Sequence, residues 1–273
     1  MAKNHDRGGH HDRGWQTIPV APEMNIKDDE GMDKTINPAC AFDTVLNPVD
    51  GTPVDNAFRF YFKEGKSRNV LVFFNGGGSC WNDATCVASL ALANVPGNRP
   101  TYNPSVLLEN SPVGAGGVFD DGNKDNPFKD WSKVFIAYCT GDIHAGSNEV
   151  AYIDVDGSIT GYPGAPVMVK HRGFDNFMAV REWMKLQFSG KKEKVNKLLV
   201  TGSSAGGYGA ILNFPYVQAA FPKTKVALLA DASASVVTEG FINDVLPWIG
   251  TGSWISHYRL FLALRWVLTL LLS

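Results

Sequence analysis

The chain has 273 residues, of which 44% are hydrophobic and 19% are charged, and its formal net charge is −2. This length and composition suit one globular α/β domain with a substantial core. A chain so close to neutral argues against a nucleic-acid-binding protein, which normally carries a basic patch. No internal repeat is visible, which argues against a repeat architecture.

The first 14 residues contain His5, His10 and His11 among Asp, Arg and Gly. We expect this segment to be disordered, because it has almost no apolar surface to bury. A metal site built from these histidines is the less favoured alternative, since His-rich tails usually lack a fixed geometry. No apolar segment of the signal-peptide type follows the first residues. We expect one domain over residues 15–244, with no metal and no cofactor.

The first predicted strands follow a Pro-, Asp- and Asn-rich stretch. Asp50-Gly51 marks a turn, so we expect a hairpin that ends in the strand-like segment 57–62 and forms the edge of the sheet. Residues 69–74 are a continuous apolar run, as expected for a strand covered on both faces in a parallel sheet. The remaining predicted elements are buried strands at 133–138 and 226–230 and a helix at 176–188.

The predicted strand at 69–74 ends in Asn75-Gly-Gly-Gly-Ser-Cys-Trp81. Glycine gives no packing, so three in a row at a strand end suggest that bare backbone amides approach a ligand oxygen, as in an oxyanion hole. A flexible turn is one alternative. A phosphate-binding loop is another, although neither the Walker A nor the Rossmann spacing is present.

The four cysteines are Cys40, Cys80, Cys86 and Cys139. Zinc would need paired spacings with histidine partners, which are missing. We favour a disulfide between Cys80 and Cys86 that closes a short loop, with Cys40 and Cys139 as a candidate long-range pair. Free buried cysteines are the alternative. Disulfides would indicate an oxidising compartment.

Asp142 and His144 follow the predicted strand at 133–138, at the edge where open α/β sheets bind ligands. His144 is a candidate catalytic base. We favour instead a histidine that orders its own loop or lines the substrate cleft, because no partner for it is evident.

Residues 197–210 predict a strand, a tight glycine turn and a helix, and Gly202-Ser203-Ser204-Ala205-Gly206 fits the G-x-S-x-G pattern of a nucleophile elbow. Small residues on either side of Ser204 would allow the sharp turn that exposes its hydroxyl. The residue after the nucleophile, Ala205, would supply an oxyanion-hole amide. The alternative is a turn whose serines only cap the helix.

Downstream of this turn, Asp231 ends the predicted strand at 226–230, and His257 follows it. Serine, acid and histidine in this order match an α/β-hydrolase triad, so Ser204, Asp231 and His257 form a candidate set. The short sequence separation between the nucleophile helix and Asp231 argues against this triad.

Four motifs together resemble the pectin acetylesterase family, which includes Notum-type carboxylesterases and bacterial esterase-like relatives. The motifs are Phe74-Asn-Gly-Gly-Gly-Ser-Cys-Trp81, Tyr138-Cys-Thr-Gly-Asp-Ile-His-Ala-Gly146, Thr201-Gly-Ser-Ser-Ala-Gly-Gly-Tyr-Gly209 and Leu229-Ala-Asp231. The resemblance covers roughly residues 40–244.

The resemblance implies an α/β-hydrolase fold with a mostly parallel sheet flanked by helices, secretion or a cell-wall location, and metal-independent removal of acyl groups. It implies that Ser204 is the nucleophile, that the amides of Gly77, Gly78 and Ala205 line the oxyanion hole, and that Cys80 and Cys86 close a loop. We also expect Trp81, Asp142 and His144 to line the substrate cleft.

The sequence departs from the family after about residue 244, because the family's catalytic Asp and His lie in a C-terminal part that is missing here. Residues 245–273 form an atypical apolar segment, for which a spliced, frameshifted or mispredicted terminus is the favoured explanation. A membrane-lying or buried helix is the alternative, since the apolar run is too short to span a bilayer and Arg265 interrupts it. We therefore expect a serine carboxylesterase, acting on a polysaccharide or another acyl ester, that is weakly active or inactive as written. The alternatives are a non-catalytic protein that binds an acylated glycan or lipid and an unstable fragment.

Overall fold

The computed structural model describes residues 14–46, 51–92, 100–107, 110–190, 194–233 and 243–248. The predicted tail (1–14) and the predicted C-terminal segment (245–273) therefore lie mostly outside the described residues. The central element of the described structure is a six-stranded sheet in the order β1-β6-β8-β7-β11-β12. Its strands are β1 (Gln16–Pro19), β6 (Arg59–Lys63), β8 (Ser132–Ile136), β7 (Asn69–Phe74), β11 (Lys197–Ser203) and β12 (Lys225–Asp231).

Four neighbouring strands of this sheet form parallel pairs. β8, β7, β11 and β12 pair with one another in parallel, whereas β1 and β6 pair antiparallel at one side of the sheet. Val72 lies opposite Val134 on β8 and Val200 on β11, and all three side chains are fully buried. A β-branched side chain packs well on a pleated sheet, so this row forms the middle of the core.

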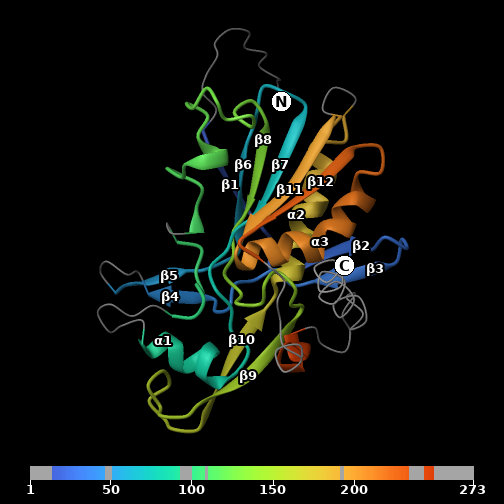
Figure 1. Ribbon diagram of the computed structural model, residues 1–273. Helices are drawn as coiled ribbons and strands as arrows, with labels where there is room; N and C mark the ends of the chain where they lie inside the picture. The colour runs from blue at the N-terminus through green and yellow to red at the C-terminus, as the bar shows by residue number, and fades with distance from the viewer. Residues whose placement is uncertain are drawn as a thin grey trace, which may run out of the picture.

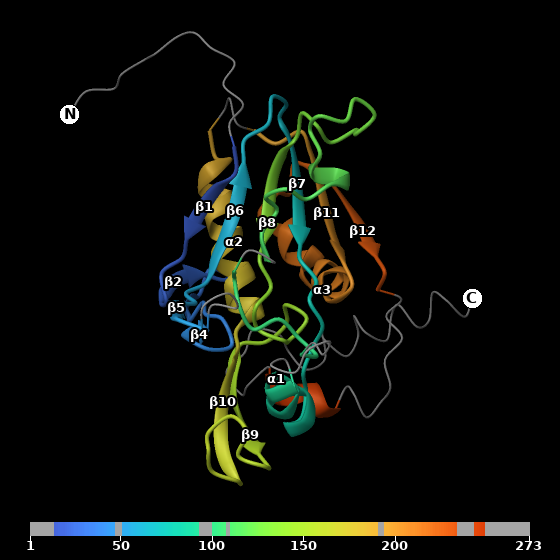
Figure 2. The ribbon, with the colours of Figure 1, turned by 90° about the vertical axis from the view of Figure 1, so that its left-hand side faces the viewer.

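Helices α2 (Gly173–Gln187) and α3 (Ala205–Ala220) cover one face of the sheet, as Figures 1 and 2 both show. Alternate residues of a strand point to opposite faces, so one set of side chains meets the helices. Phe74 of β7 packs against Phe177 of α2 with ring centroids 5.5 Å apart, and Trp183 packs against Phe62 of β6 at 5.0 Å.

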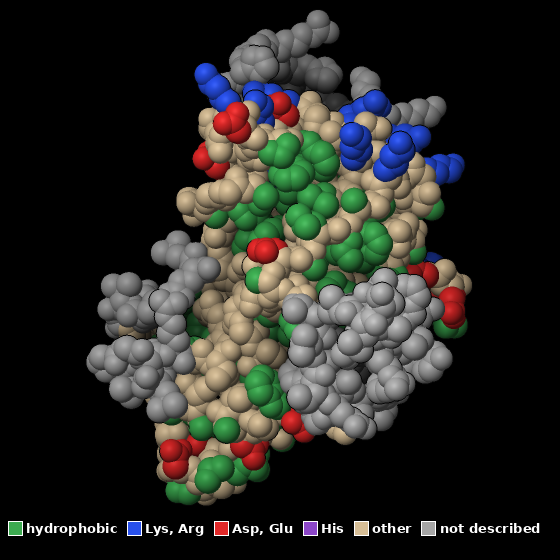
Figure 3. Space-filling view, viewed as in Figure 1, with side chains coloured by type: hydrophobic (Ala, Val, Ile, Leu, Met, Phe, Trp, Pro, Cys, Tyr) green, Lys and Arg blue, Asp and Glu red, His purple; other side chains and the backbone are tan. Residues whose placement is uncertain are grey.

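The opposite face is covered in part by the segment that contains the 3-10 turn η3 (Gly117–Phe119). Phe73 of β7 packs there against Phe119, with centroids 4.9 Å apart. Towards β12 this face is open in the described part of the chain, and Leu229 is 57% exposed. Figure 3 shows hydrophobic side chains gathered over this face of the sheet.

Smaller elements surround the sheet. The hairpin of β9 (Asn148–Asp154) and β10 (Ala165–His171) projects beyond the ends of the central strands (Figure 1). The remaining elements are β2 (Met24–Lys27), β3 (Asp33–Ile36), β4 (Thr44–Leu46), β5 (Pro53–Asp55), η1 (Ala84–Ala88), α1 (Ser89–Leu92) and η4 (Leu246–Trp248). None of the helices in the described ranges is both long and apolar enough to cross a bilayer.

Residues of η4 pack on the base of this hairpin. The Trp248 carbonyl accepts a hydrogen bond from the Ser147 amide (2.8 Å), and the Trp248 ring lies 5.2 Å from that of His171. The folded structure therefore continues at least to Trp248.

The fold prediction is confirmed: a mostly parallel sheet flanked by helices, with a strand–turn–helix unit at its centre, is α/β-hydrolase-like. The strands expected at 69–74, 133–138 and 226–230 and the helix expected at 176–188 are present. The expected edge was wrong. β6, which contains most of the segment 57–62, is the second strand of the sheet, because β1 pairs with it and forms the edge. The hairpin around the predicted turn at 50–51 forms between β4 and β5, outside the central sheet.

Candidate active site

Ser204 occupies the sharp turn between β11 and α3. Its φ of 58° and ψ of −126° lie in a region that residues with side chains rarely adopt. A backbone strain of this kind costs on the order of 1–3 kcal/mol and persists only where the surroundings enforce it. Here the Ser204 amide donates to the Asp231 carbonyl of β12 (3.0 Å), and the Ser204 carbonyl accepts from the Gly207 amide (2.9 Å).

The glycines on either side of this turn explain its geometry. A Cβ atom on Gly202 would lie 2.2 Å from the carbonyl oxygen of Gly206. A Cβ atom on Gly206 would lie 2.0 Å from the carbonyl oxygen of Phe74, in the neighbouring strand. Both positions exclude any side chain, which is the physical reason for the small residues of the pattern.

The Ser204 side chain is exposed and makes no capping hydrogen bond to α3. The helix-cap alternative is therefore wrong for this residue. A hydroxyl held in solvent at the N-terminus of a helix is the arrangement that a nucleophile elbow requires.

The glycine loop after β7 passes directly over this turn. A Cβ atom on Gly76 would lie 2.5 Å from the Ser203 carbonyl oxygen and 3.2 Å from Ser204 Cβ. Gly77 and Gly78 have φ of 148° and 82°, which favour glycine. An antiparallel bridge to Tyr102 holds Gly78 in place.

Three backbone amides in this region have no acceptor in the described part of the chain. They are the amides of Gly77 and Gly78 in the glycine loop and that of Ala205, the first residue of α3. The first amides of a helix have no partner within the helix. Unpaired N–H groups beside an exposed hydroxyl can stabilise a negative oxygen, which is the chemistry of an oxyanion hole.

Asp142 is fully buried in the loop after β8. Its carboxylate accepts hydrogen bonds from the Thr140 hydroxyl (2.6 Å) and from three backbone amides, those of His144 (3.1 Å), Gly146 (3.1 Å) and Gly173 (2.7 Å). Burial raises the pKa of this carboxyl to about 6, although the four donors act in the opposite direction. Asp142 therefore holds its loop against the start of α2 and does not line an open cleft.

His144 is also buried, with 1% of its surface exposed. Its Nε2 lies 2.9 Å from the carbonyl oxygen of Asn75, which can only accept, so Nε2 carries the proton. Burial lowers the pKa of this imidazole to about 4. His144 therefore orders the loops around it, which is one of the two favoured roles, and its burial does not support the other, a place in an open cleft.

Three residues of this region were not predicted as site residues. Asn75 donates through Nδ2 to Asn110 Oδ1 (2.7 Å), and Asn110 Oδ1 accepts from the Tyr138 amide (2.9 Å). The Tyr138 hydroxyl accepts from the Ile143 amide (2.8 Å). Asn75 and Tyr138 belong to the quoted motifs, but nothing in the sequence marks Asn110, because its partners lie 35 and 28 residues away.

Both disulfides are present, Cys80–Cys86 after the glycine loop and Cys40–Cys139 at the end of β8, so the free-cysteine alternative is wrong. The Cys80 and Cys86 sulfurs lie near His171. The two ring nitrogens of His171 are hydrogen-bonded to the Thr140 carbonyl and to the Tyr152 hydroxyl, each at 2.9 Å. The two cysteine sulfurs are joined in a disulfide and both His171 nitrogens are hydrogen-bonded, so these three residues do not form a metal site.

The other predicted site residues receive less support. Trp81 is half-buried just beyond the glycine loop, and its place in a cleft stays a prediction. Asp231 lies beside the elbow, where its carboxylate accepts from the Ser203 hydroxyl (3.3 Å). His257 lies outside the described residues, so the Ser204–Asp231–His257 set also stays a prediction.

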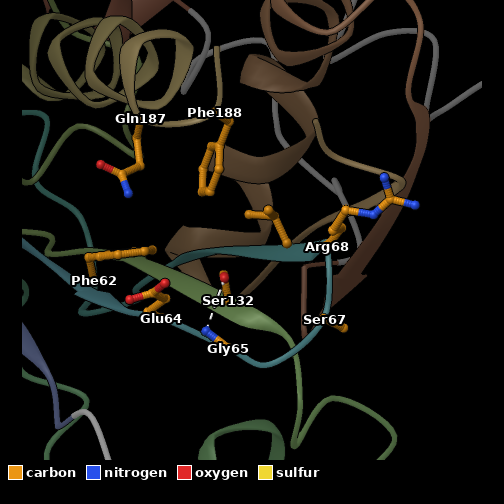
Figure 4. A pocket seen from close by; sticks show the side chains of 9 residues that line it. Phe62, Glu64, Gly65, Ser67, Arg68, Ser132, Gln187 and Phe188 are labelled. Carbon is orange, nitrogen blue, oxygen red and sulfur yellow. Dashed lines mark hydrogen bonds between the residues drawn. The ribbon is translucent and has the colours of Figure 1, made fainter. Parts of the chain in front are cut away.

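Two cavities lie away from Ser204. The smaller, of about 130 Å³, is formed by the N-terminal ends of β7 and β8 and the end of α2, where the Gly65 amide donates to the Ser132 hydroxyl (Figure 4). The larger, of about 410 Å³, lies beside Lys170 and Arg172, which are paired with carboxylates. Parallel sheets bind ligands at the carboxyl ends of their strands, so the smaller cavity lies at the wrong end for catalysis.

A family model described as pectinacetylesterase matches residues 47–241 of the chain. Among curated proteins, pectin acetylesterase 11 of Arabidopsis thaliana is 29% identical over 182 residues, which cover 63% of this chain and 39% of that protein. Human palmitoleoyl-protein carboxylesterase NOTUM is 28% identical over 202 residues, which cover 67% of this chain and 33% of that protein.

A solved structure of the Wnt deacylase Notum from Drosophila is similar with a TM-score of 0.49 and 16% identity, covering 89% of this chain and 68% of the other. The matched residues span 39% or less of the two curated relatives named above.

Proposed function

Because this chain belongs to the pectinacetylesterase family, whose members are carboxylic ester hydrolases, we propose that it is a serine carboxylesterase with Ser204 as its nucleophile. The single observation that carries the proposal is the elbow itself. Ser204 combines a strained backbone, an exposed hydroxyl and unpaired amides on two neighbouring segments.

In the proposed reaction, the Ser204 hydroxyl attacks the ester carbonyl, and its proton passes to a base. The negative oxygen of the tetrahedral intermediate accepts hydrogen bonds from the amides of Gly77, Gly78 and Ala205. Collapse of this intermediate expels the alcohol and leaves an acyl-serine. Water then attacks the acyl-serine and releases the carboxylic acid.

The described residues include no histidine that could act as the base from solvent. The only described histidines are His144 and His171, and both are buried with at least one ring nitrogen hydrogen-bonded to a backbone carbonyl. We propose that neither is the base, that His257 is the in-chain candidate with Asp231 as its acid, and that activity without an added base is weak. An intact oxyanion hole alone leaves roughly a 10³ to 10⁴-fold rate enhancement over water.

The proposed substrate is an acylated polysaccharide, with acetate as the released acid, because the family model and the plant relatives are acetylesterases by description. A longer acyl group on a protein is the second candidate, since the human relative is described as a palmitoleoyl-protein carboxylesterase. We propose secretion, because two disulfides suit an oxidising compartment.

A fluorophosphonate probe tests the proposal directly, because it labels only an activated serine. We expect slow labelling of the folded protein, since no base is established, that is lost in Ser204→Ala and retained in Ser203→Ala, which removes the adjacent hydroxyl. p-Nitrophenyl esters of increasing chain length then distinguish acetate from longer acyl groups. Labelling that survives Ser204→Ala would overturn the assignment.

The alternative proposal is a non-catalytic protein that binds an acylated glycan or lipid in the same place. Saturable binding of an acetylated oligosaccharide, measured by calorimetry, together with no fluorophosphonate labelling would favour this alternative. Labelling together with turnover would exclude it.

A further inference from the structure

We propose that His144 is a positioning residue that holds the two halves of the oxyanion hole at a fixed separation. The inference rests on the proposed esterase function and deepens it. The two halves are the glycine loop after β7, with Gly77 and Gly78, and the N-terminus of α3, with Ala205. They belong to segments more than 100 residues apart in the chain, and His144 contacts both.

On one side, His144 holds the start of the glycine loop. Its Nε2–H donates to the carbonyl oxygen of Asn75 (2.9 Å), the residue directly before the three glycines. The Asn75 amide donates to the Ile136 carbonyl (3.1 Å), and the Asn75 side chain donates to Asn110 (2.7 Å). Asn75 is thus fixed through its carbonyl, its amide and its side chain, and the imidazole provides the first of these contacts.

On the other side, His144 holds helix α3. The carbonyl oxygen of His144 accepts a hydrogen bond from Asn213 Nδ2 (3.0 Å). The ring lies against the helix backbone at Gly209, where a Cβ atom would lie 2.6 Å from His144 Cδ2. Any side chain at position 209 would displace the ring, so this glycine sets the distance between imidazole and helix.

The surroundings of His144 leave it little freedom to move. Its ring lies between Phe74 (centroids 5.1 Å apart) and Tyr138 (4.6 Å). Its amide donates to Asp142 (3.1 Å), and its φ of 61° is held by that loop. The Tyr138 ring also lies under the glycine loop, 3.2 Å from where a Cβ atom of Gly77 would be. A rigid imidazole in this position can transmit the placement of α3 to the glycine loop.

Positioning matters here because oxyanion stabilisation depends on donors aimed at one point. Loss of a single donor lowers kcat by about 10²- to 10³-fold in a serine protease. Displacement of the glycine loop by a fraction of an ångström would weaken the hydrogen bonds from Gly77 and Gly78 without removing either residue.

The test compares two substitutions of similar size and flexibility. His144→Gln keeps an N–H donor that can reach the Asn75 carbonyl, whereas His144→Met fills the same space without a donor. Both lose the aromatic ring, so a difference between them reports the hydrogen bond. His171→Met serves as the control for loss of a buried histidine, because the ring nitrogens of His171 are hydrogen-bonded to Tyr152 and Thr140 and to neither the glycine loop nor α3.

The first measurement is amide hydrogen exchange of Asn75, Ser79 and Asn103, which does not depend on catalysis. Their amides donate to the carbonyls of Ile136, Thr101 and Gly77, so their exchange reports opening of the glycine loop. We expect exchange at least about 10-fold faster in His144→Met than in the unsubstituted protein, with His144→Gln within about threefold, because the carbonyl contact fixes the loop. The second measurement is the rate constant for fluorophosphonate capture by Ser204. We expect a decrease of about 10-fold or more in His144→Met and little change in His171→Met, measured on folded protein.

The inference would be overturned if the amides of His144→Met and His144→Gln exchanged at equal rates. It would also be overturned if His171→Met lowered the capture rate as much as His144→Met does. Absence of capture in the unsubstituted protein would instead contradict the proposed esterase function. The exchange experiment would still decide whether His144 positions the loop.

Discussion

Two loops at the same edge of the sheet contrast sharply, the turn at Ser204 after β11 and the loop at Asp142 and His144 after β8. Both contain non-glycine residues with positive φ, 58° at Ser204 and 61° at His144. The Ser204 hydroxyl is exposed and caps nothing, whereas the polar groups of Asp142 and His144 are buried and hydrogen-bonded. A polar residue at the carboxyl end of a parallel strand is therefore not by itself a reacting group, because its burial decides whether substrate can reach it.

The largest expected effects come from removing one side chain from each loop. Ser204→Ala should abolish fluorophosphonate labelling and change the free energy of unfolding by less than about 1 kcal/mol, because an exposed hydroxyl contributes little to stability. Asp142→Ala should lower the free energy of unfolding by more than about 4 kcal/mol, because it leaves four buried donors unpaired. Urea unfolding and labelling of both variants measure the contrast, and a stable Asp142→Ala protein would contradict it.

A similar contrast is expected between glycines. Gly206→Ala would place a methyl group 2.0 Å from the Phe74 carbonyl oxygen, so we expect a loss of at least about 3 kcal/mol of stability. Gly116→Ala meets no atom within 4 Å and should change stability by about 0.5 kcal/mol or less. Thermal unfolding of the two variants provides the comparison. Comparable melting temperatures would show that the elbow has room to relax.

The buried histidines should make the protein sensitive to acid. Burial lowers the pKa of His144 to about 4 and that of His171 to about 3 from the usual 6.5, so the unfolded state binds more protons below that value. Each histidine thus contributes stability that is present above pH 6.5 and is lost as the pH falls towards its native pKa, by about 3 kcal/mol or more.

Asp142 acts with the opposite sign, because its native pKa of about 6 lies above the usual 3.8. Its contribution favours the native state in acid and is lost as the pH rises through about 6. Burial also raises the pKa of Asp175, which acts in the same direction as Asp142. The pKa shifts of the two histidines are the larger ones, so the free energy of unfolding should fall between about pH 7 and about pH 4.5. His171→Gln should flatten this dependence. The same slope in the substituted protein would contradict the assignment.

The smallest expected difference is the one between the two disulfides. Cys80–Cys86 closes a sequence separation of 6 and Cys40–Cys139 one of 99. Chain-entropy arguments give a loss of about 2 kcal/mol for Cys80→Ser/Cys86→Ser and about 4 to 5 kcal/mol for Cys40→Ser/Cys139→Ser. Unfolding of both double variants measures the difference of about 2 kcal/mol. A larger effect of the short loop would indicate that Cys80–Cys86 supports the glycine loop directly.

The sequence by itself determined the features that depend on neighbouring residues. A continuous apolar run such as 69–74 is typical of a strand covered on both faces, as β7 is. The G-x-S-x-G spacing predicts the turn at Ser204, because a side chain on Gly202 would clash with Gly206 within the turn itself. In the glycine loop, Gly76 and Gly78 are explained by close approach to the backbone of Ser203 and Thr101, and Gly77 by its φ of 148°.

Only the tertiary structure decided which polar groups lie in solvent and which lie in the core. Asp142 and His144 follow a strand as an active-site residue would, but contacts with α2, α3 and the glycine loop bury both. Asn110 has no local signal because its partners, Asn75 and Tyr138, meet it only when β7 and β8 pair. Burial depends on such long-range pairing, so no sequence pattern at these positions could have revealed it.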